Sequence, residues 1–257
     1  MIIDTHTHLF VEQFDQDLDQ VVRRALDEDV EYFLLPNIDD ESIERLHATV
    51  ERYPDRMFPM MGLHPTSVDR RWKERLATVE KTLKNGKYYG IGEIGMDLYW
   101  DTTYAKEQEQ VLRTQLNWAK EMNLPVSIHI RKAFDEIFPV IEDEQDGRLR
   151  GVFHCFTGTY EQALRAIDLN MMLGIGGVVT FKNGKINKFL DKIPLQHLVV
   201  ETDAPWLTPS PFRGKRNEPA YLKYIVEKLA DIYHTTPKEI ACITTQNALD
   251  VFKSLPV

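Results

Sequence analysis

Short apolar segments alternate with longer amphipathic segments along the whole chain. Most of the short segments are apolar without interruption, which is typical of β-strands that are covered on both faces. Eight of them are candidate strands: Ile2–Thr5, Tyr32–Pro36, Met57–Leu63, Tyr89–Ile94, Pro125–Ile130, Gly151–Phe156, Met171–Gly176 and His197–Thr202. The pattern therefore predicts strands and helices in regular alternation.

The segments between the strands carry helical periodicity. After the fourth strand, Leu112, Leu116 and Ala119 recur at i, i+4 and i+7, which gives a helix one apolar stripe for packing on a sheet. Alternating β and α units imply parallel strands, and eight units predict a closed TIM-like (β/α)8 barrel, a single α/β domain over residues 1–257. An open doubly wound sheet is the alternative. No GxGxxG motif or P-loop follows the first strand, which disfavours dinucleotide and nucleotide-triphosphate binding.

Composition narrows the protein class. Of 257 residues, 43% are hydrophobic and 28% are charged, as in soluble globular proteins. No apolar run approaches the ~20 residues of a membrane span, and the N-terminal segment lacks the pattern of a signal peptide. Only Cys155 and Cys242 are present, so we expect a reduced, cytoplasmic setting. The net charge of −9 argues against indiscriminate nucleic-acid binding, but it leaves room for a local basic patch.

Histidines and carboxylates gather where the predicted strands end. Five of the eight histidines lie at or just past a carboxyl end: His6, His8, His64, His129 and His154. Glu93 ends the fourth predicted strand, and Asp203 follows the eighth. Because the carboxyl ends of barrel strands surround one mouth, these side chains are predicted to converge there.

This set of side chains predicts a metal site. His6 and His8 are two residues apart, so in an extended chain they share a face and can bind one ion. Glu93 stands between glycines, where a carboxylate can bridge two ions roughly 3.5–4 Å apart. Asp203 is predicted to ligate a metal and to accept the proton of the attacking water. Nitrogen and carboxylate donors favour Zn, Mn, Co, Ni or Fe over Ca, and Mg fits if substrate phosphate adds oxygens. The competing interpretations are structural histidines and a Glu93 paired with Arg or Lys.

Several other residues are candidates for substrate binding. His64 precedes Pro65 and is either a substrate contact or a capping residue, while Glu201 is expected to be structural. Two late loops carry basic residues, either to bind phosphates or as solvated charge: Lys182, Lys185, Arg213, Lys215 and Arg216. Aromatic residues near the same mouth are suited to stacking on unpaired bases, or equally to packing: Tyr99, Trp100, Phe181 and Trp206.

Seven short motifs follow one another along almost the whole chain: DTHTH at 4–8, GLHP at 62–65, GIGEIGMD at 90–97, IHIR at 128–131, VFHCFTG at 152–158, ETDAPWL at 201–207 and RGKRNEP at 213–219. Together they resemble the TatD-like metal-dependent deoxyribonucleases, a branch of the amidohydrolase-type barrels. The sequence departs from the family's usual spelling at Met96, at Ile130–Lys132 and at Trp206, none of which is a predicted ligand.

The resemblance implies a function. By it, the metal ligands are His6, His8, Glu93, His129, His154 and Asp203, with Glu93 and Asp203 catalytic. They are expected to hold divalent ions, two per chain, with Mg, Mn or Zn as the candidates. The implied activity is phosphodiester hydrolysis in DNA, at ends or on single strands and 3'-5' exonuclease-like, by a monomer that needs no membrane. The rival functions are an amidohydrolase-type enzyme acting on a small carbonyl or phosphoester compound, and a non-catalytic barrel that binds a partner.

Overall fold

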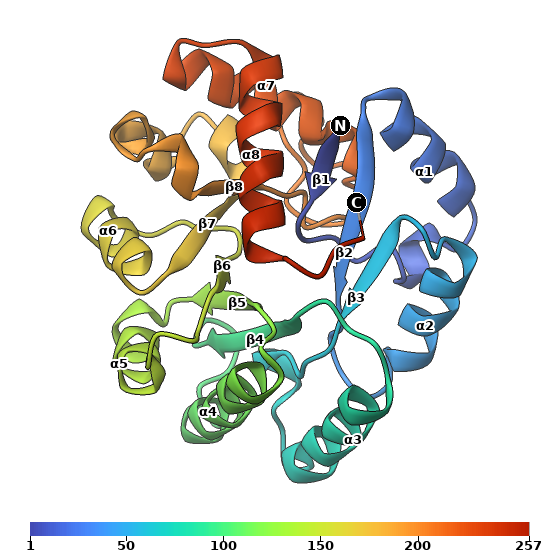
Figure 1. The fold of residues 1–257 in the computed structure, drawn as a ribbon, viewed down its shortest axis with the longest axis vertical. Coiled ribbons are helices and arrows are strands. Elements are labelled where there is room, and N and C mark those ends of the chain that lie inside the picture. The colour runs from blue at the N-terminus through green and yellow to red at the C-terminus, as the bar shows by residue number, and fades with distance from the viewer. Residues whose placement is uncertain (257) are drawn as a thin grey trace.

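The inner ring of the protein is made of eight parallel strands surrounded by helices (Figure 1), as the computed structural model of residues 1–256 describes. The strands are β1 (Ile2–Asp4), β2 (Val30–Pro36), β3 (Met57–Met60), β4 (Ile91–Asp97), β5 (Val126–Arg131), β6 (Gly151–Phe153), β7 (Met171–Ile175) and β8 (Leu198–Val200). All eight predicted strands are present, and the predicted TIM-like barrel is confirmed. The last one begins a residue later than predicted, because His197 ends a 3-10 turn.

The ring closes through two seams between separate ladders. Regular pairing joins β1 to β3 in one sheet and β4 to β8 in another. Between β3 and β4, the Tyr89 amide donates to the Pro59 carbonyl at 2.9 Å. Between β8 and β1, the Thr5 amide donates to the Val200 carbonyl at 3.1 Å. The second bond brings the first and last strands together.

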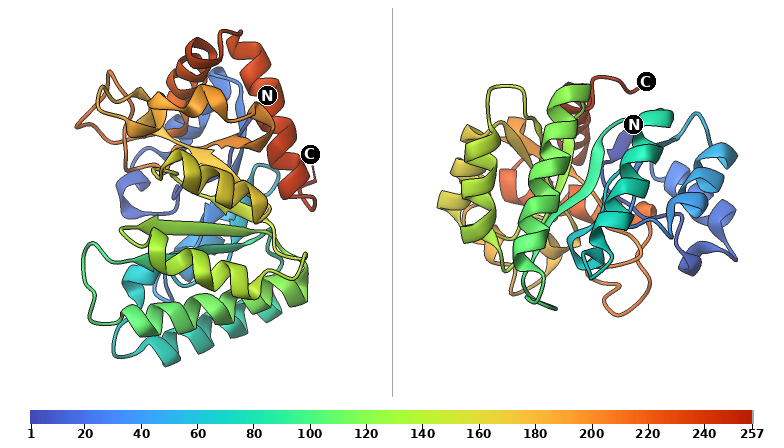
Figure 2. Two further views of the ribbon diagram at one scale, coloured as in Figure 1. Left: turned by 90° about the vertical axis from the view of Figure 1, so that its left-hand side faces the viewer. Right: turned by 90° about the horizontal axis from the view of Figure 1, so that it is seen from below.

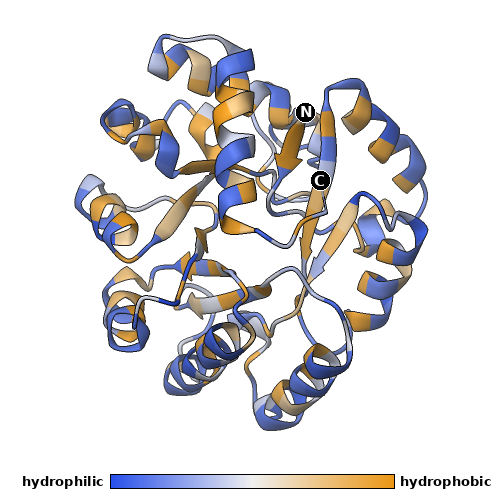
Figure 3. Cartoon of the chain, viewed as in Figure 1, coloured by the Kyte–Doolittle hydropathy of each residue, from blue (hydrophilic) through white to orange (hydrophobic). Residues whose placement is uncertain are grey.

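The helices cover the outside of the ring. They are α1 (Leu18–Asp27), α2 (Ile43–Arg52), α3 (Trp72–Asn85), α4 (Ala105–Met122), α5 (Phe134–Glu144), α6 (Tyr160–Asp168), α7 (Leu222–Tyr233) and α8 (Pro237–Val251). Hydrophobic and hydrophilic residues alternate along them (Figure 3), and the predicted stripe Leu112, Leu116 and Ala119 of α4 is buried. None of the helices within residues 1–256 is both long and apolar enough to cross a membrane.

The connection after β7 departs from the predicted alternation. Four 3-10 turns stand in place of an α-helix: η3 (Gly177–Thr180), η4 (Lys185–Lys188), η5 (Leu190–Lys192) and η6 (Leu195–His197). Glycines at 176, 177 and 184 and a proline at 194 interrupt this stretch, and both residue types disfavour a continuous helix. The two helices that follow β8 complete the outer ring.

The interior of the barrel has an apolar floor. Inward side chains such as Ile3, Leu34 and Val199 form a cluster separate from the core under the outer helices. Helix α8 lies against this end of the barrel (Figure 1), and Phe252, just beyond it, is fully buried in the cluster. The floor therefore closes the end of the barrel at which the strands begin.

The opposite end carries the longest loops. In the left view of Figure 2, the loop between β4 and α4 and the loops after β7 and β8 project from one side, away from both termini. These loops follow carboxyl ends of strands. The active site of a (β/α)8 barrel lies on this face.

Phe252 is expected to stabilise the fold only by its packing in the apolar floor. Phe252→Ala should lower the free energy of unfolding by about 3–5 kcal/mol, the usual cost of removing a buried phenyl ring. Urea denaturation followed by circular dichroism measures this loss. Lys253→Ala, at the exposed neighbouring position, is the control and should change it little. Equal stability of the two variants would contradict this role of the floor.

Candidate metal centre

One carboxylate lies at the centre of the mouth. Glu93 is 3% exposed, and each of its two oxygens faces a different group of histidines. Its Oε2 lies 3.2 Å from His6 Nε2 and 3.4 Å from His8 Nε2. Asp203 completes this first group, since its Oδ1 lies 3.5 Å from His8 Nε2.

The second group surrounds the other oxygen of Glu93. Its Oε1 lies 2.9 Å from His129 Nδ1 and 2.9 Å from His154 Nε2. His64 Nε2 approaches the same oxygen at 3.3 Å. The structure thus brings together all six predicted metal ligands, in two sets that share Glu93.

In each histidine, the far ring nitrogen is the one that points away from Glu93. The contacts of these far nitrogens show that this donor set suits metal ions. His129 Nε2 lies 3.0 Å from Asp97 Oδ2, and His154 Nδ1 lies 3.3 Å from Glu201 Oε1. Asp97 accepts a hydrogen bond from the far nitrogen of His129 and so leaves the lone pair of its near nitrogen directed at the centre, whereas His154 Nδ1 lies close to Glu201 without a hydrogen bond. His6 Nδ1 makes the equivalent contact with Ser127 Oγ at 2.9 Å. This is the usual arrangement around metal-ligating histidines.

His64 presents a proton to the centre, where the other histidines present a lone pair. Its Nδ1 accepts a hydrogen bond from the Thr66 amide at 3.1 Å, so it caps the short helix η2 (Pro65–Ser67). A neutral His64 must then carry its proton on Nε2, the nitrogen that faces Glu93. This histidine is a donor toward the centre, which fits the predicted substrate contact better than a metal ligand. Of the two alternatives offered by the sequence, the cap is present, and the substrate contact stays a prediction.

The position of Glu93 corrects one prediction. Glu93 does not end its strand, because β4 continues to Asp97. The pairing of β4 with β5 shifts between Ile91 and Ile94, and the amide of Glu93 donates instead to the Asn37 carbonyl at 2.9 Å. This irregularity releases Glu93 from the alternation of the strand and aims it into the barrel. Periodicity alone does not reveal such a bulge.

Asp203 is positioned by the seam between β8 and β1. Its amide donates to the His6 carbonyl at 2.9 Å, and its backbone has a φ of 55°. The side chain of Asp203 is 13% exposed, whereas that of Glu93 is 4% exposed. Of these two carboxylates, Asp203 is therefore the one that water reaches more easily.

Glu201 supports the second group from below, as expected. Its buried carboxylate accepts from the Cys155 amide and faces His154. A glycine on the neighbouring strand makes the space, because a Cβ at Gly174 would lie 2.3 Å from Glu201 Oε2. That oxygen has no hydrogen-bond partner among the described residues.

Burial and charge set the protonation of the donors. Burial raises the pKa of Glu93, but His64, His154 and His6 outweigh it and hold this pKa well below its ordinary value. Burial lowers the pKa of His8, but the hydrogen bonds that it donates to Asp203 and Glu93 raise it to about 9. Without a cation between them, His8, His129 and His154, whose pKa values are raised, therefore hold protons more readily than free histidines, whereas burial lowers the pKa of His6 and His64.

The two basic loops lie side by side at the mouth. The Ser210 amide donates to Thr180 Oγ1 at 2.8 Å, and the Arg213 guanidinium lies 3.7 Å from the centre of the Phe181 ring. Four of the predicted phosphate contacts are exposed: Lys182, Lys185, Arg213 and Lys215. Arg216 differs, because both its terminal nitrogens lie 2.7 Å from the carboxylate of Asp17. Its charge is neutralised there, so Arg216 ties its loop to the start of α1.

Sequence reasoning missed Asp97 and Ser127, which orient His129 and His6. Ser127 precedes His129 by two residues in β5, so strand alternation was a signal for it. Arg131 lies two residues further along the same face of β5, and both Arg131 and Lys132 reach the mouth of the barrel. Asp97 had no such signal, because its role depends on the neighbouring strand.

The barrel and its paired donor groups define a metal-dependent hydrolase. Comparison with known proteins specifies the family. A family model described as TatD related DNase matches residues 3–253. The chain belongs to this TatD family, as the sequence motifs indicated.

Relatives and solved structures agree over nearly the full length. The uncharacterized metal-dependent hydrolase YabD of Bacillus subtilis is 42% identical over 254 residues, covering 98% of this chain and 99% of the relative. The uncharacterized metal-dependent hydrolase TatD of Mycobacterium tuberculosis is 31% identical, with 96% of each chain covered. The crystal structure of YJJV, a TatD homolog from Escherichia coli K12, superposes with a TM-score of 0.92 at 30% identity and covers 98% of both chains.

Metal binding is expected to release protons without reshaping the fold. Since the raised pKa of His8, about 9, keeps a proton on the metal-free site, a divalent ion must displace it. The affinity for Zn²⁺ or Mn²⁺ should therefore rise with pH through the neutral range. Titration calorimetry in buffers of different ionisation enthalpy measures the protons released.

The same protein tests the need for metal. Chelation should abolish hydrolysis while the far-UV circular dichroism stays unchanged, because the floor and outer core are apolar. Full activity after exhaustive chelation would contradict the metal centre. A binding enthalpy that is independent of the buffer would contradict the protonation of the free site.

Proposed function

We propose that this protein hydrolyses phosphodiester bonds in DNA, at ends or on single strands, in a 3'-5' exonuclease-like manner. The observation that carries the proposal is the shared carboxylate: each oxygen of Glu93 faces its own set of nitrogen donors. A bridging carboxylate of this kind suits two divalent ions, with Mg, Mn and Zn as candidates. Two-metal sites recur in nucleases and phosphatases.

The chemistry divides between metal and protein. Bound divalent ions lower the pKa of water towards ~7 and neutralise the charge of phosphoryl oxygens. Asp203, the more accessible carboxylate, orients the attacking water and accepts its proton. His64 Nε2, which carries a proton while Nδ1 caps η2, donates to a phosphoryl oxygen. Asp97, Glu201 and Ser127 hold the ring nitrogens in place.

The surroundings of the centre favour DNA over a small carbonyl substrate. Exposed Lys182, Lys185, Arg213 and Lys215 border the mouth of a chain whose net charge is −9. Cationic side chains attract a phosphate backbone, whereas a small neutral ester has no use for them. Phosphate recognition confined to one mouth suits a strand end better than a long duplex.

We also propose a cytoplasmic, monomeric enzyme. Both cysteines are free, as in proteins of reducing compartments. The centre draws all its donors from one chain, so a single copy supplies a full set.

Ligand and base roles are separable by two isosteric changes. Glu93→Gln should lower metal occupancy, because a bridging carboxylate loses its charge. Asp203→Asn should retain more metal yet lose turnover by about 10²–10⁴-fold, since an amide does not accept a proton. Elemental analysis and single-turnover cleavage of end-labelled single-stranded DNA measure the two effects. Near-normal turnover in metal-loaded Asp203→Asn protein would assign the base elsewhere.

The basic loops are expected to position the DNA backbone. Neutralising Lys182, Lys185 and Lys215 to Ala should raise KM for DNA and reduce the log–log salt slope by roughly 0.7 for each lost contact with a single strand. A small chromogenic phosphodiester should be affected far less, because it has no flanking phosphates. Arg148→Ala, an exposed arginine paired with Asp146, is the control. Equal losses on both substrates would mean that the loops shape the centre instead.

A further inference from the structure

A groove of about 490 Å³ opens beside the metal centre on the catalytic face. Its walls come from the loop after β4, the end of β5 and the segment after β7, and the residues that matter are Tyr99, Arg131, Lys132, Phe181 and Lys185. The volume falls within the roughly 300–1,000 Å³ of small-molecule sites. Its lining includes both aromatic rings and positive charges.

Tyr99 of the groove and two other aromatic residues of the catalytic face, Trp100 and Trp206, are unusually exposed. Among residues 1–256, the large aromatic side chains with the highest exposure are Tyr99 at 52%, Trp100 at 69% and Trp206 at 43%. All three lie in loops that follow carboxyl ends of strands. Exposed apolar surface gathered on one face marks a binding site.

Arginines hold these rings in place. The guanidinium carbon of Arg131 lies 4.2 Å from the centre of the Tyr99 ring and 5.0 Å from that of Trp100. On the opposite wall, Arg213 lies 3.7 Å from the centre of the Phe181 ring. In each wall a guanidinium therefore lies over a ring, and the stacked pair combines a π-surface with a cation, a combination on which unpaired bases stack.

Asp97 couples this groove to the metal centre. Its Oδ2 holds His129, while its Oδ1 accepts from the Tyr99 amide at 2.9 Å and the Trp100 amide at 3.3 Å. Arg131 pairs with Asp97 across the ladder and follows His129 by two residues. One carboxylate thus positions both a metal ligand and the aromatic wall.

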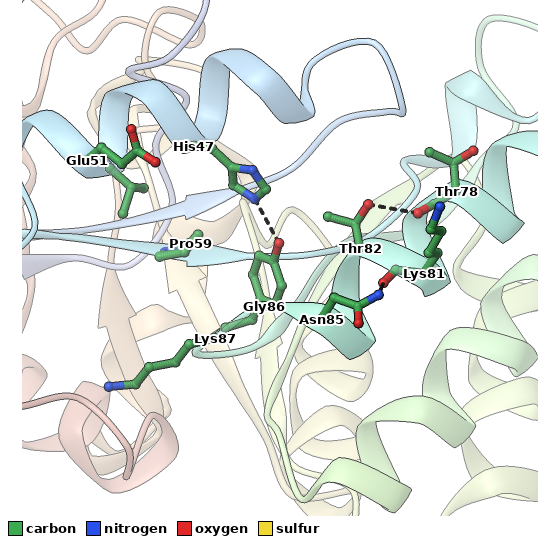
Figure 4. A pocket seen from close by; sticks show the side chains of 11 residues that line it. His47, Glu51, Pro59, Thr78, Lys81, Thr82, Asn85, Gly86 and Lys87 are labelled. Carbon is green, nitrogen blue, oxygen red and sulfur yellow. Dashed lines mark hydrogen bonds between the residues drawn. The ribbon is translucent and has the colours of Figure 1, made fainter.

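A second groove, of similar volume, serves as a comparison. It has about 560 Å³ and lies between α2 and α3 (Figure 4). There, His47 Nε2 and the Tyr88 hydroxyl are 2.8 Å apart. Tyr88 is 7% exposed, so its ring offers little face for stacking. Neither groove is lined by a predicted metal ligand, but only the first includes residues next to one, Ile130 and Arg131 beside His129. Size alone therefore does not select the site.

We propose that the groove of Tyr99, Arg131 and Phe181 is a subsite for one unpaired nucleobase of the substrate, with Lys132 and Lys185 on its flanking phosphate. This inference rests on the proposed DNA hydrolysis and specifies where one nucleotide binds. The base stacks against Tyr99 or Phe181, and its sugar-phosphate leads toward His129 and the centre. Because stacking uses the π-face that every base has, the subsite tolerates any base but requires one.

Abasic scanning tests the subsite. The substrates are single-stranded oligonucleotides that lack one base at successive positions from the labelled end. For the wild-type holoenzyme, we expect one position at which loss of the base raises KM by about 5- to 150-fold, the range measured for stacking of single bases. In Tyr99→Ala and Phe181→Ala proteins, the same abasic substitution should cost much less, because the wall that it served is gone. Leu164→Ala, which removes an exposed apolar side chain of α6, should keep the wild-type penalty.

A binding measurement separates contact from catalysis. Fluorescence of 2-aminopurine at the identified position should be quenched on binding to metal-free wild-type protein, and less so with Tyr99→Ala. DNA cleavage with equal KM at every abasic position would overturn the subsite while leaving DNA hydrolysis intact. Penalties that are the same in wild-type and both aromatic variants would overturn it as well. Metal-dependent cleavage of small esters without any cleavage of DNA would instead overturn the proposed function, and the subsite with it.

Discussion

The shared carboxylate of Glu93 is the constraint on which the rest of the structure depends. Two sets of imidazole nitrogens approach its two oxygens within 3.4 Å, inside a barrel that excludes most water. Buried polar groups at this density are costly unless they are paired or bind an ion. Every nearby feature serves this arrangement: a bulge in β4 that aims the carboxylate, a glycine on β7 that makes space, and partners that fix the histidine rings.

The residues that stabilise the barrel and those that form the metal centre lie at opposite ends of it. An apolar floor, completed by Phe252, fills the end at which the strands begin, and the polar centre fills the end at which they finish. Parallel strands permit this division, because all their carboxyl ends lie on one side. The loops that follow them are free to carry charge and aromatic surface without weakening the core.

Asp97 joins the metal centre to the aromatic loop beside it. Its two oxygens serve different structures, one holding a metal ligand and the other ordering the loop that bears Tyr99 and Trp100. Displacement of that loop would therefore disturb His129, and a change at the centre would reach the aromatic wall. Recognition and chemistry are linked through a side chain that belongs to neither group of donors.

The sequence by itself determined the strand order, the barrel and the six convergent donors, because apolar periodicity and strand-end position are local properties that barrel topology converts into proximity. Only the tertiary structure decided which ring nitrogen of each histidine faces the centre, since that depends on partners from other strands such as Asp97 and Ser127. It also paired Arg216 with Asp17, almost two hundred residues away in the chain, and so neutralised the charge of one residue predicted to bind phosphate. The groove arose in the same way, from loops whose juxtaposition no local pattern encodes.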